Sequence, residues 1–333
     1  MAKRANSVIF GFDFQENAAI VLMVKNMAEM ESIKIEGEED IEIKLNDGTY
    51  VLAQAKSIEK SSTDFSNVRA KAKKAMESLS DAVKKHRVRE LIYYTNSPDP
   101  FKDEASKPMF YGPSIVKYEN LPDSTKNLIG DWLSQINEPL DASKLQIHVL
   151  PFETDDDDQR YKAVVEKVSD FIGKMQLSSL DGLRNQLHEV WLTMLDRNAS
   201  KLDETIRLGK KDIVWPIIVF VTGQRNLERY SKYCTDLDDG EYDEIVYRYG
   251  ELIENYCDRY EFVIRVISDY YEGDYKGIKA IEYFVNDHWN EYADMLGLNT
   301  VEESIRGNLT KIVLYTILKK RFEINRIKQS VKL

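Results

Sequence analysis

The sequence predicts an α/β domain followed by a mostly α-helical domain, and two observations support this division. Strand-like apolar runs alternate with helical patterns up to about residue 150, whereas later residues show only three- and four-residue apolar spacing. The chain of 333 residues is also long enough for two buried cores. We expect domains at residues 1–153 and 159–333. The acidic run Asp155–Asp158 is taken as their boundary, although it also suits the first turn of a helix.

The elements of the first domain follow from apolar periodicity and turn residues. The apolar run Ala18–Met27 indicates a helix, and alternating apolar residues indicate strands on either side of a basic amphipathic helix. Five prolines make residues 97–125 loop-like. The expected order is helix 14–30, strands 33–36, 40–45 and 50–56, helix 69–89, strand 89–95, helix 124–136 and strand 145–150.

Residues 40–56 carry the most informative pattern, a predicted β-hairpin. Asn46-Asp47-Gly48-Thr49 contains an Asp-Gly turn signal between two strand-like runs. Pairing centred on Gly48 places the apolar side chains on one sheet face, in the pairs Ile41/Ala55, Ile43/Ala53 and Leu45/Val51. The other face then carries Asp40, Glu42, Gln54 and Lys56, with Asp40 directly opposite Lys56. A carboxylate, an amide oxygen and an ammonium gathered in this way favour a site for a divalent cation and a phosphate.

These residues resemble the PD-(D/E)XK superfamily, the restriction-endonuclease-like nucleases, in the variant where Gln replaces the second acid. Asp40 and Gln54-Ala55-Lys56 match the motif, and Gly11-Phe12-Asp13-Phe14-Gln15 is similar to the G-x-x-[YF]-Q start of the first helix in one branch. That branch is the nuclease domain of effectors in bacterial anti-phage systems such as CBASS and Lamassu. The resemblance covers roughly residues 5–100. It implies a restriction-endonuclease-like domain with a mixed sheet flanked by helices.

The resemblance also implies a metal-dependent endodeoxyribonuclease. Its catalytic residues would be Asp40, Gln54, Lys56 and Gln15, and its Mg²⁺ or Mn²⁺ ligands would be Asp40, Gln54 and Glu39. Hard cations prefer oxygen ligands, lower the pKa of a bound water and polarise phosphate oxygens. Gln54 supplies only a neutral amide oxygen, so we expect weak metal binding and leave the number of metals open. Lys56 would position the attacking water or stabilise the phosphate as a point charge.

Each of these side chains also has a purely structural interpretation. A cross-strand Asp–Lys pair is usually a solvated ion pair, a strand Gln is often polar surface, and Gln15 can hydrogen-bond to its own helix start. The acidic residues Glu36, Glu38, Glu39 and Glu42 offer one further metal ligand, Glu39 or Glu42, while most of them are expected to be solvated. The combination of the two motifs favours the functional interpretation.

The charge distribution constrains how such a chain would meet DNA. A formal net charge of −11 argues against indiscriminate binding of nucleic acid over the whole surface. Positive charge is concentrated at residues 69–89. We predict that Lys73, Lys74, Lys84 and Lys85 contact the phosphate groups of double-stranded DNA. The alternative is a helix face that is simply solvated.

Several other kinds of site are disfavoured. Two widely spaced cysteines, Cys234 and Cys257, and four histidines without ligand spacing indicate neither a disulfide framework nor a zinc site, and fit a reducing cytoplasm. The N-terminal residues lack the apolar core of a secretion signal. We expect no membrane span, because the longest apolar stretch, Val214–Val221, is short and contains Pro216. No P-loop occurs, so nucleotide hydrolysis would come from another subunit.

Beyond residue 158 the pattern is helical and rich in Tyr and Trp. The expected helices are 161–175, 180–195, 243–268, 277–296 and 301–327. Aromatic residues at helical spacing are mostly core, but the excess suits contacts with protein. We therefore expect residues 159–333 to bind a partner subunit or a second copy of the chain, and the active form to be a homo-oligomer.

The anti-phage resemblance implies the nature of that partner. In Lamassu-like systems it is an SMC-like ATPase with an accessory subunit, which would restrain and trigger the nuclease, and we place this interpretation first. A HerA-like ATPase or translocase is second, and a cyclic-oligonucleotide sensor of the CBASS kind fits the helical second half least. Two other classes stay open: a degenerate nuclease domain that binds DNA or protein, and a scaffold whose hairpin matches the motif by chance.

Overall fold

The computed structural model describes residues 2–37, 39–59, 67–177, 182–203, 205–222, 237–257, 259–298 and 301–333. The chain forms two compact units. The first, here called the sheet unit, comprises Met1–Ile213 together with Val331–Leu333, and the second, the helical unit, comprises Val214–Ser330. The division therefore falls well after the acidic run at which we expected it.

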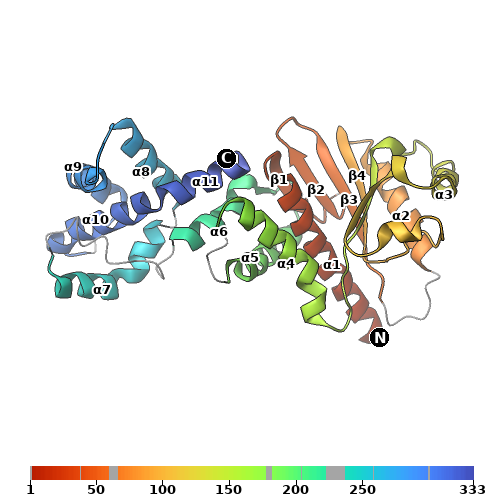
Figure 1. Cartoon of the computed structure of the whole chain (residues 1–333), viewed down its shortest axis with the longest axis horizontal. Coiled ribbons are helices and arrows are strands. Elements are labelled where there is room, and N and C mark those ends of the chain that lie inside the picture. Colours follow the sequence, from red (N-terminus) through yellow and green to blue (C-terminus); the bar gives the residue numbers. More distant parts are fainter. Residues whose placement is uncertain are drawn as a thin grey trace. The chain divides into compact units, whose positions relative to one another are not determined.

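The sheet unit is built on a mixed sheet of seven strands in the order β5-β6-β4-β3-β2-β1-β7 (Figure 1). Strands β1 to β3 form an antiparallel meander, β3 pairs in parallel with β4, and β4 pairs in parallel with β6. The strands are β1 Met30–Ile35, β2 Ile41–Leu45, β3 Tyr50–Lys56, β4 Val88–Thr95, β5 Ser114–Lys117, β6 Leu145–Val149 and β7 Leu208–Gly209. A mixed sheet with flanking helices, as predicted, is confirmed. Strands β5 and β7 were not predicted.

Helices cover both faces of the central strands. The helices of this unit are α1 Ala2–Asn26, α2 Asn67–Ala82, α3 Asp123–Leu133, α4 Asp157–Lys174 and α5 Leu183–Ala199. Leu52 of β3 belongs to the apolar cluster that includes Met76 of α2. The neighbouring Val51 and Ala53 therefore point to the opposite face, which α1 covers. As a result both residue sets of β3 are buried, and the prediction of one open polar face is wrong.

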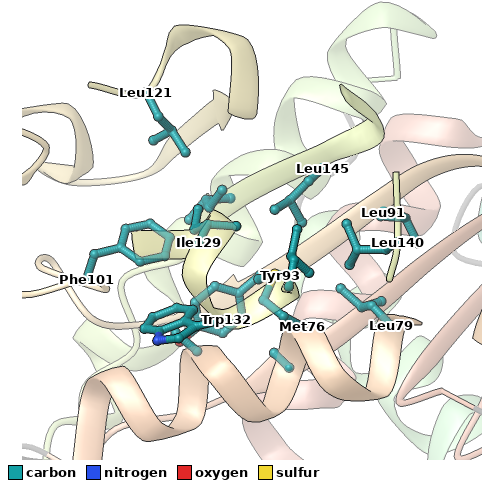
Figure 2. Packing of buried hydrophobic residues seen from close by; sticks show 14 of the residues in the cluster. Met76, Leu79, Leu91, Tyr93, Phe101, Leu121, Ile129, Trp132, Leu140 and Leu145 are labelled. Carbon is teal, nitrogen blue, oxygen red and sulfur yellow. The ribbon is translucent and has the colours of Figure 1, made fainter. Parts of the chain in front are cut away.

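The core between α2, α3 and the sheet is mainly aromatic and aliphatic (Figure 2). Tyr93 of β4 is fully buried and lies 6.5 Å from the ring of Phe101, which in turn lies 6.3 Å from Trp132 of α3. Residues 97–125, expected to be a loop, supply part of this cluster. They also contain the short helices η1 Lys107–Phe110 and η2 Tyr118–Asn120, while η3 Ala142–Lys144 leads into β6.

Helices α4 and α5 belong to the sheet unit because they pack on α1. The buried ring of Phe14 lies 5.5 Å from that of Phe152. Arg160, near the start of α4, lies 3.5 Å from a carboxylate oxygen of Asp13. Asp156 caps α4 by accepting a hydrogen bond of 3.1 Å from Gln159 N, so the acidic run forms the first turn of a helix rather than a domain boundary.

The C-terminal residues return to the sheet unit. The ammonium of Lys210, which is buried, donates hydrogen bonds to the backbone carbonyls of Ala28, Val331 and Lys332 at 3.1 to 3.3 Å. Separately, α1 is the one helix within the described ranges that is long and apolar enough to cross a membrane, over Asn6–Asn26. The expectation that no run has that length therefore does not hold. Half of this window is buried inside the protein, as in a helix that covers a sheet.

The described part of the helical unit contains no strand, as expected. Its helices, together with the two that cross its boundaries, are α6 Lys210–Thr222, α7 Asp239–Cys257, α8 Tyr260–Glu272, α9 Ala280–Met295, α10 Glu303–Lys319 and α11 Arg321–Val331. The predicted helices 243–268 and 301–327 are each divided into two. Tyr249 also departs from helical geometry within α7, at φ −116° and ψ 15°. Helix α6 was not predicted, because Pro216 lies inside it.

Candidate functional site

The hairpin is formed by β2 and β3, but its register differs from the prediction. Ile41 pairs with Ala53 and Ile43 with Val51, a shift of two residues from the predicted pairs. Gly48 adopts a φ of +76° and closes a three-residue loop, so the pairing is centred one residue earlier. Because a shift of two keeps every side chain on its original face, the polar residues still share one face.

Asp40 is the centre of a hydrogen-bond cluster at the start of β2. Its Oδ2 atom accepts from the backbone N–H of Ala55 at 2.8 Å and from Lys56 Nζ at 3.1 Å. Its backbone carbonyl accepts from Gln15 Nε2 at 2.8 Å. The Asp40 and Lys56 side chains are 18% and 25% exposed, so the pair is only partly solvated and open to a ligand. Three of the predicted catalytic residues therefore meet.

These residues line a pocket of about 380 Å³. One wall is a single face of α1, because Val8, Gly11, Phe12 and Gln15 recur at three- and four-residue spacing. The other wall comes from the sheet and α2. The full lining is Ser7, Val8, Gly11, Phe12, Gln15, Glu36, Asp40, Ala55, Lys56, Ser57 and Lys71.

Lys71 is a pocket residue that the sequence reasoning grouped with the basic helix but did not select. Its Nζ donates to the carbonyl of Ser57 at 2.5 Å, which places the ammonium at the end of β3. Burial lowers the pKa of Lys71 from its usual value. The register of α2 against β3 positions it here, and that register is a tertiary feature that local spacing does not reveal.

Glu39 lies beside the pocket rather than in its lining. Its side chain is 4% exposed, and Oε2 is a buried oxygen without a hydrogen-bond partner. Burial, and then the neighbouring Asp40, raise the pKa of the Glu39 carboxyl to about 8, so it is protonated at neutral pH. Glu36 lines the pocket, and Glu38 lies outside the described residues.

The other two polar residues of this face are used within the fold. Gln54 is 4% exposed, lies on the face covered by α2, and does not line the pocket. Glu42 accepts from Arg207 Nη1 at 2.9 Å, while Arg207 Nε donates to Ser32 at 3.0 Å. Glu42 thus holds the segment before β7 against the sheet, which argues against its use as a metal ligand.

The four predicted DNA-binding lysines are not grouped in space. Lys73 and Lys74 lie on the first half of α2, near Lys71, and Lys73 donates to Gln135 at 2.8 Å. Lys84 and Lys85 follow the end of α2 at Ala82, which is roughly 16 Å along the helix from Lys71. Lys84 is paired with Asp81 at 2.9 Å. None of the four lines the pocket.

The donor atoms present suit a hard cation in kind. Glu39 Oε2 is a carboxyl oxygen that lacks a hydrogen-bond partner, and the carboxylate of Asp40 is partly exposed. Within the described residues no group of three or more His, Cys, Asp or Glu side chains is arranged to hold a metal. A metal here would therefore depend on Asp40 and Glu39, because the predicted ligand Gln54 does not line the pocket. His148 and His188 are buried, and burial lowers the pKa of His188 to about 4.

No family model and no curated protein matches the chain. Three solved structures of an Acinetobacter baumannii Cap4 SAVED/CARF-domain containing receptor are similar, each at 14% identity and a TM-score of 0.38. The one with the cyclic trinucleotide 3'3'3'-cAAA covers 70% of this chain and 50% of its own. The one with 2'3'3'-cAAA covers 78% and 58%, and the one described without a ligand 78% and 60%. The chain thus spans half to three fifths of these receptors.

Proposed function

We propose that the chain is a metal-dependent DNA endonuclease of the PD-(D/E)XK type. The observation that carries this is the convergence of Gln15, Asp40 and Lys56, from three separate elements, in one pocket. The element order α1-β1-β2-β3-α2-β4, with an antiparallel meander followed by a parallel pair, supports the restriction-endonuclease-like interpretation.

The chain's own residues have distinct tasks under this proposal. Asp40 and Glu39 would hold Mg²⁺ or Mn²⁺, which when bound supplies an acidified water and polarises the phosphate. Gln15 holds the backbone of Asp40 in place by donating a hydrogen bond to the Asp40 carbonyl. Lys56 places a positive charge beside Asp40, where it stabilises negative charge on a phosphate.

Nicking of supercoiled plasmid by the purified chain tests the proposal. We expect cleavage in Mg²⁺ or Mn²⁺, none in EDTA, and none for Asp40→Ala or Lys56→Ala. Lys44→Ala is the matched control, because Lys44 lies on β2 and pairs with Glu31 away from the pocket. Wild-type cleavage rates for Lys56→Ala would refute the assignment.

One observation favours a degenerate, binding-only domain as the second candidate. Asp40 Oδ2 is already satisfied by Ala55 N and Lys56 Nζ, and Gln54 is buried. A binding-only protein would retain DNA or partner affinity but show no metal-dependent nicking under any condition. The plasmid assay with a parallel binding measurement therefore separates the two candidates.

We also propose that the nuclease is the cytoplasmic effector of an anti-phage complex, controlled through the helical unit by an SMC-like ATPase with its accessory subunit or by a HerA-like ATPase. The resemblance of the motifs supports this choice. Large side chains on the helical unit are exposed, including Tyr247, Ile278, Tyr283 and Phe322, as expected of a protein-binding surface. Co-purification of the full chain with its candidate ATPase, and loss of that association after Tyr247→Ser and Tyr283→Ser, would test it.

A further inference from the structure

Phe12 is an aromatic residue at the mouth of the candidate active site. Its side chain is 46% exposed and lines the pocket that contains Asp40 and Lys56. An exposed apolar side chain alone needs no explanation. The position is informative, because Phe12 precedes Gln15 by one helical turn, a rise of about 5 Å. Gln15 is the residue that holds the Asp40 backbone.

The two walls of the pocket differ in chemistry. Val8, Gly11 and Phe12 form an apolar wall on α1, whereas Lys56 and Lys71 bring two ammonium groups to the other side. A nucleotide combines the matching features, since it carries a planar base with an apolar face next to an anionic phosphate. The pocket volume of about 380 Å³ lies at the small end for ligand sites, which suits a single nucleotide rather than a duplex.

Charge within the pocket is nearly balanced. Lys56 and Lys71 are offset by Asp40 and Glu36, so attraction for a phosphate in the absence of metal is small. The apolar wall should therefore supply a substantial share of the affinity. Stacking of a base on an aromatic side chain changes affinity by about 5- to 150-fold per base. A Cβ atom at Gly11 would lie 3.8 Å from Ser57 Oγ, so the glycine leaves space between α1 and the end of β3.

We propose that Phe12 stacks on an unpaired nucleobase adjacent to the phosphate held at Asp40 and Lys56. The bases of an intact duplex present no free face, so the preferred substrate is DNA with an unstacked nucleotide at the cleaved position: a single strand, a frayed end or a flipped base. This inference rests on the nuclease proposal and specifies its substrate class.

Fluorescence anisotropy in EDTA, with the full chain, tests the base contact. The probes are a single-stranded oligonucleotide, the same strand with abasic positions, and a blunt duplex. The variants are Phe12→Ala, Phe12→Leu and Phe12→Tyr. Ile9→Ala is the matched control, because Ile9 is 67% exposed on the same helix but does not line the pocket. Thermal unfolding of each variant verifies the fold.

We expect the wild-type chain and Ile9→Ala to bind the single strand more tightly than the abasic strand or the duplex. Phe12→Ala and Phe12→Leu should bind the single strand about fivefold or more weakly than the wild-type chain, with no change in affinity for the abasic strand. Phe12→Tyr should retain the wild-type affinity for the single strand. Equal affinities of Phe12→Ala and Ile9→Ala would overturn the base contact but leave the nuclease proposal intact. A wild-type chain that neither binds these DNAs in EDTA nor cleaves them in Mg²⁺ or Mn²⁺ would overturn both.

Discussion

Replacing Glu39 by glutamine should stabilise the sheet unit at neutral pH, by an amount that depends on pH. The Glu39 carboxyl has its pKa raised from 4.5 to about 8, mainly by burial. The unfolded chain therefore loses this proton first, and the free energy of unfolding falls as the pH rises from 4.5 to 8. The slope is about 1.4 kcal/mol per pH unit. At pH 7 the accumulated cost is about 3 kcal/mol, which glutamine avoids because it does not ionise.

Urea unfolding of the wild-type chain and Glu39→Gln at pH 5, 6, 7 and 8, without divalent cations, measures this difference. Comparing the two proteins at each pH cancels the contributions of all other titrating groups. The gain should be below about 1 kcal/mol at pH 5 and reach about 3 kcal/mol at pH 7. A difference that stays constant across this range would show that Glu39 ionises normally. If Glu39 is a metal ligand, Mg²⁺ affinity should also rise towards pH 8 as the carboxyl ionises.

Three further outcomes are expected. Lys71→Glu should weaken DNA binding and flatten its salt dependence more than Lys84→Glu and Lys85→Glu together, measured by anisotropy at increasing salt; a larger effect of the latter pair would move the DNA path to the far end of α2. A fragment of residues 1–153 lacks the helices that cover α1 and should fail to fold by circular dichroism, so a soluble, cooperatively unfolding fragment would contradict the observed domain division. Lys210→Met should lower the free energy of unfolding by about 1–3 kcal/mol, because three backbone carbonyls lose their hydrogen-bond donor. Urea unfolding measures this change, and an unchanged midpoint would mean that these hydrogen bonds make no net contribution to stability.

The polar and apolar faces of the hairpin could be predicted from alternation alone, but its register could not. Alternation specifies only which sheet face each side chain occupies, and a register shift of two residues leaves every side chain on the same face. The shift arises in the loop, where Asp47 Oδ1 accepts from Thr49 N at 2.9 Å and Gly48 takes the left-handed conformation. Asp40 nevertheless meets Lys56, because a long side chain reaches a diagonal neighbour across the strands.

The surroundings of the site depended on long-range packing that no local pattern encodes. From its strand alone, Gln54 would be expected to be an exposed polar residue, yet it is buried beneath α2. Lys71 and Lys85 look alike in a basic segment, yet only Lys71 lies at the pocket, because α2 ends at Ala82 and its N-terminal half faces the end of β3. The role of Gln15 was foreseen only as part of a motif; the bond to the Asp40 carbonyl shows how the motif positions the acid.

The return of Val331–Leu333 to the sheet unit makes that unit discontinuous in sequence, with the helical unit inserted into it. The sheet unit therefore depends on segments on both sides of the helical unit, and it is complete only after residues 331–333 have been synthesised. Lys210 would lack two of its acceptors until then. A nascent chain that has not yet reached residues 331–333 would thus have an incomplete sheet unit, although nearly all of the helical unit would already have been synthesised.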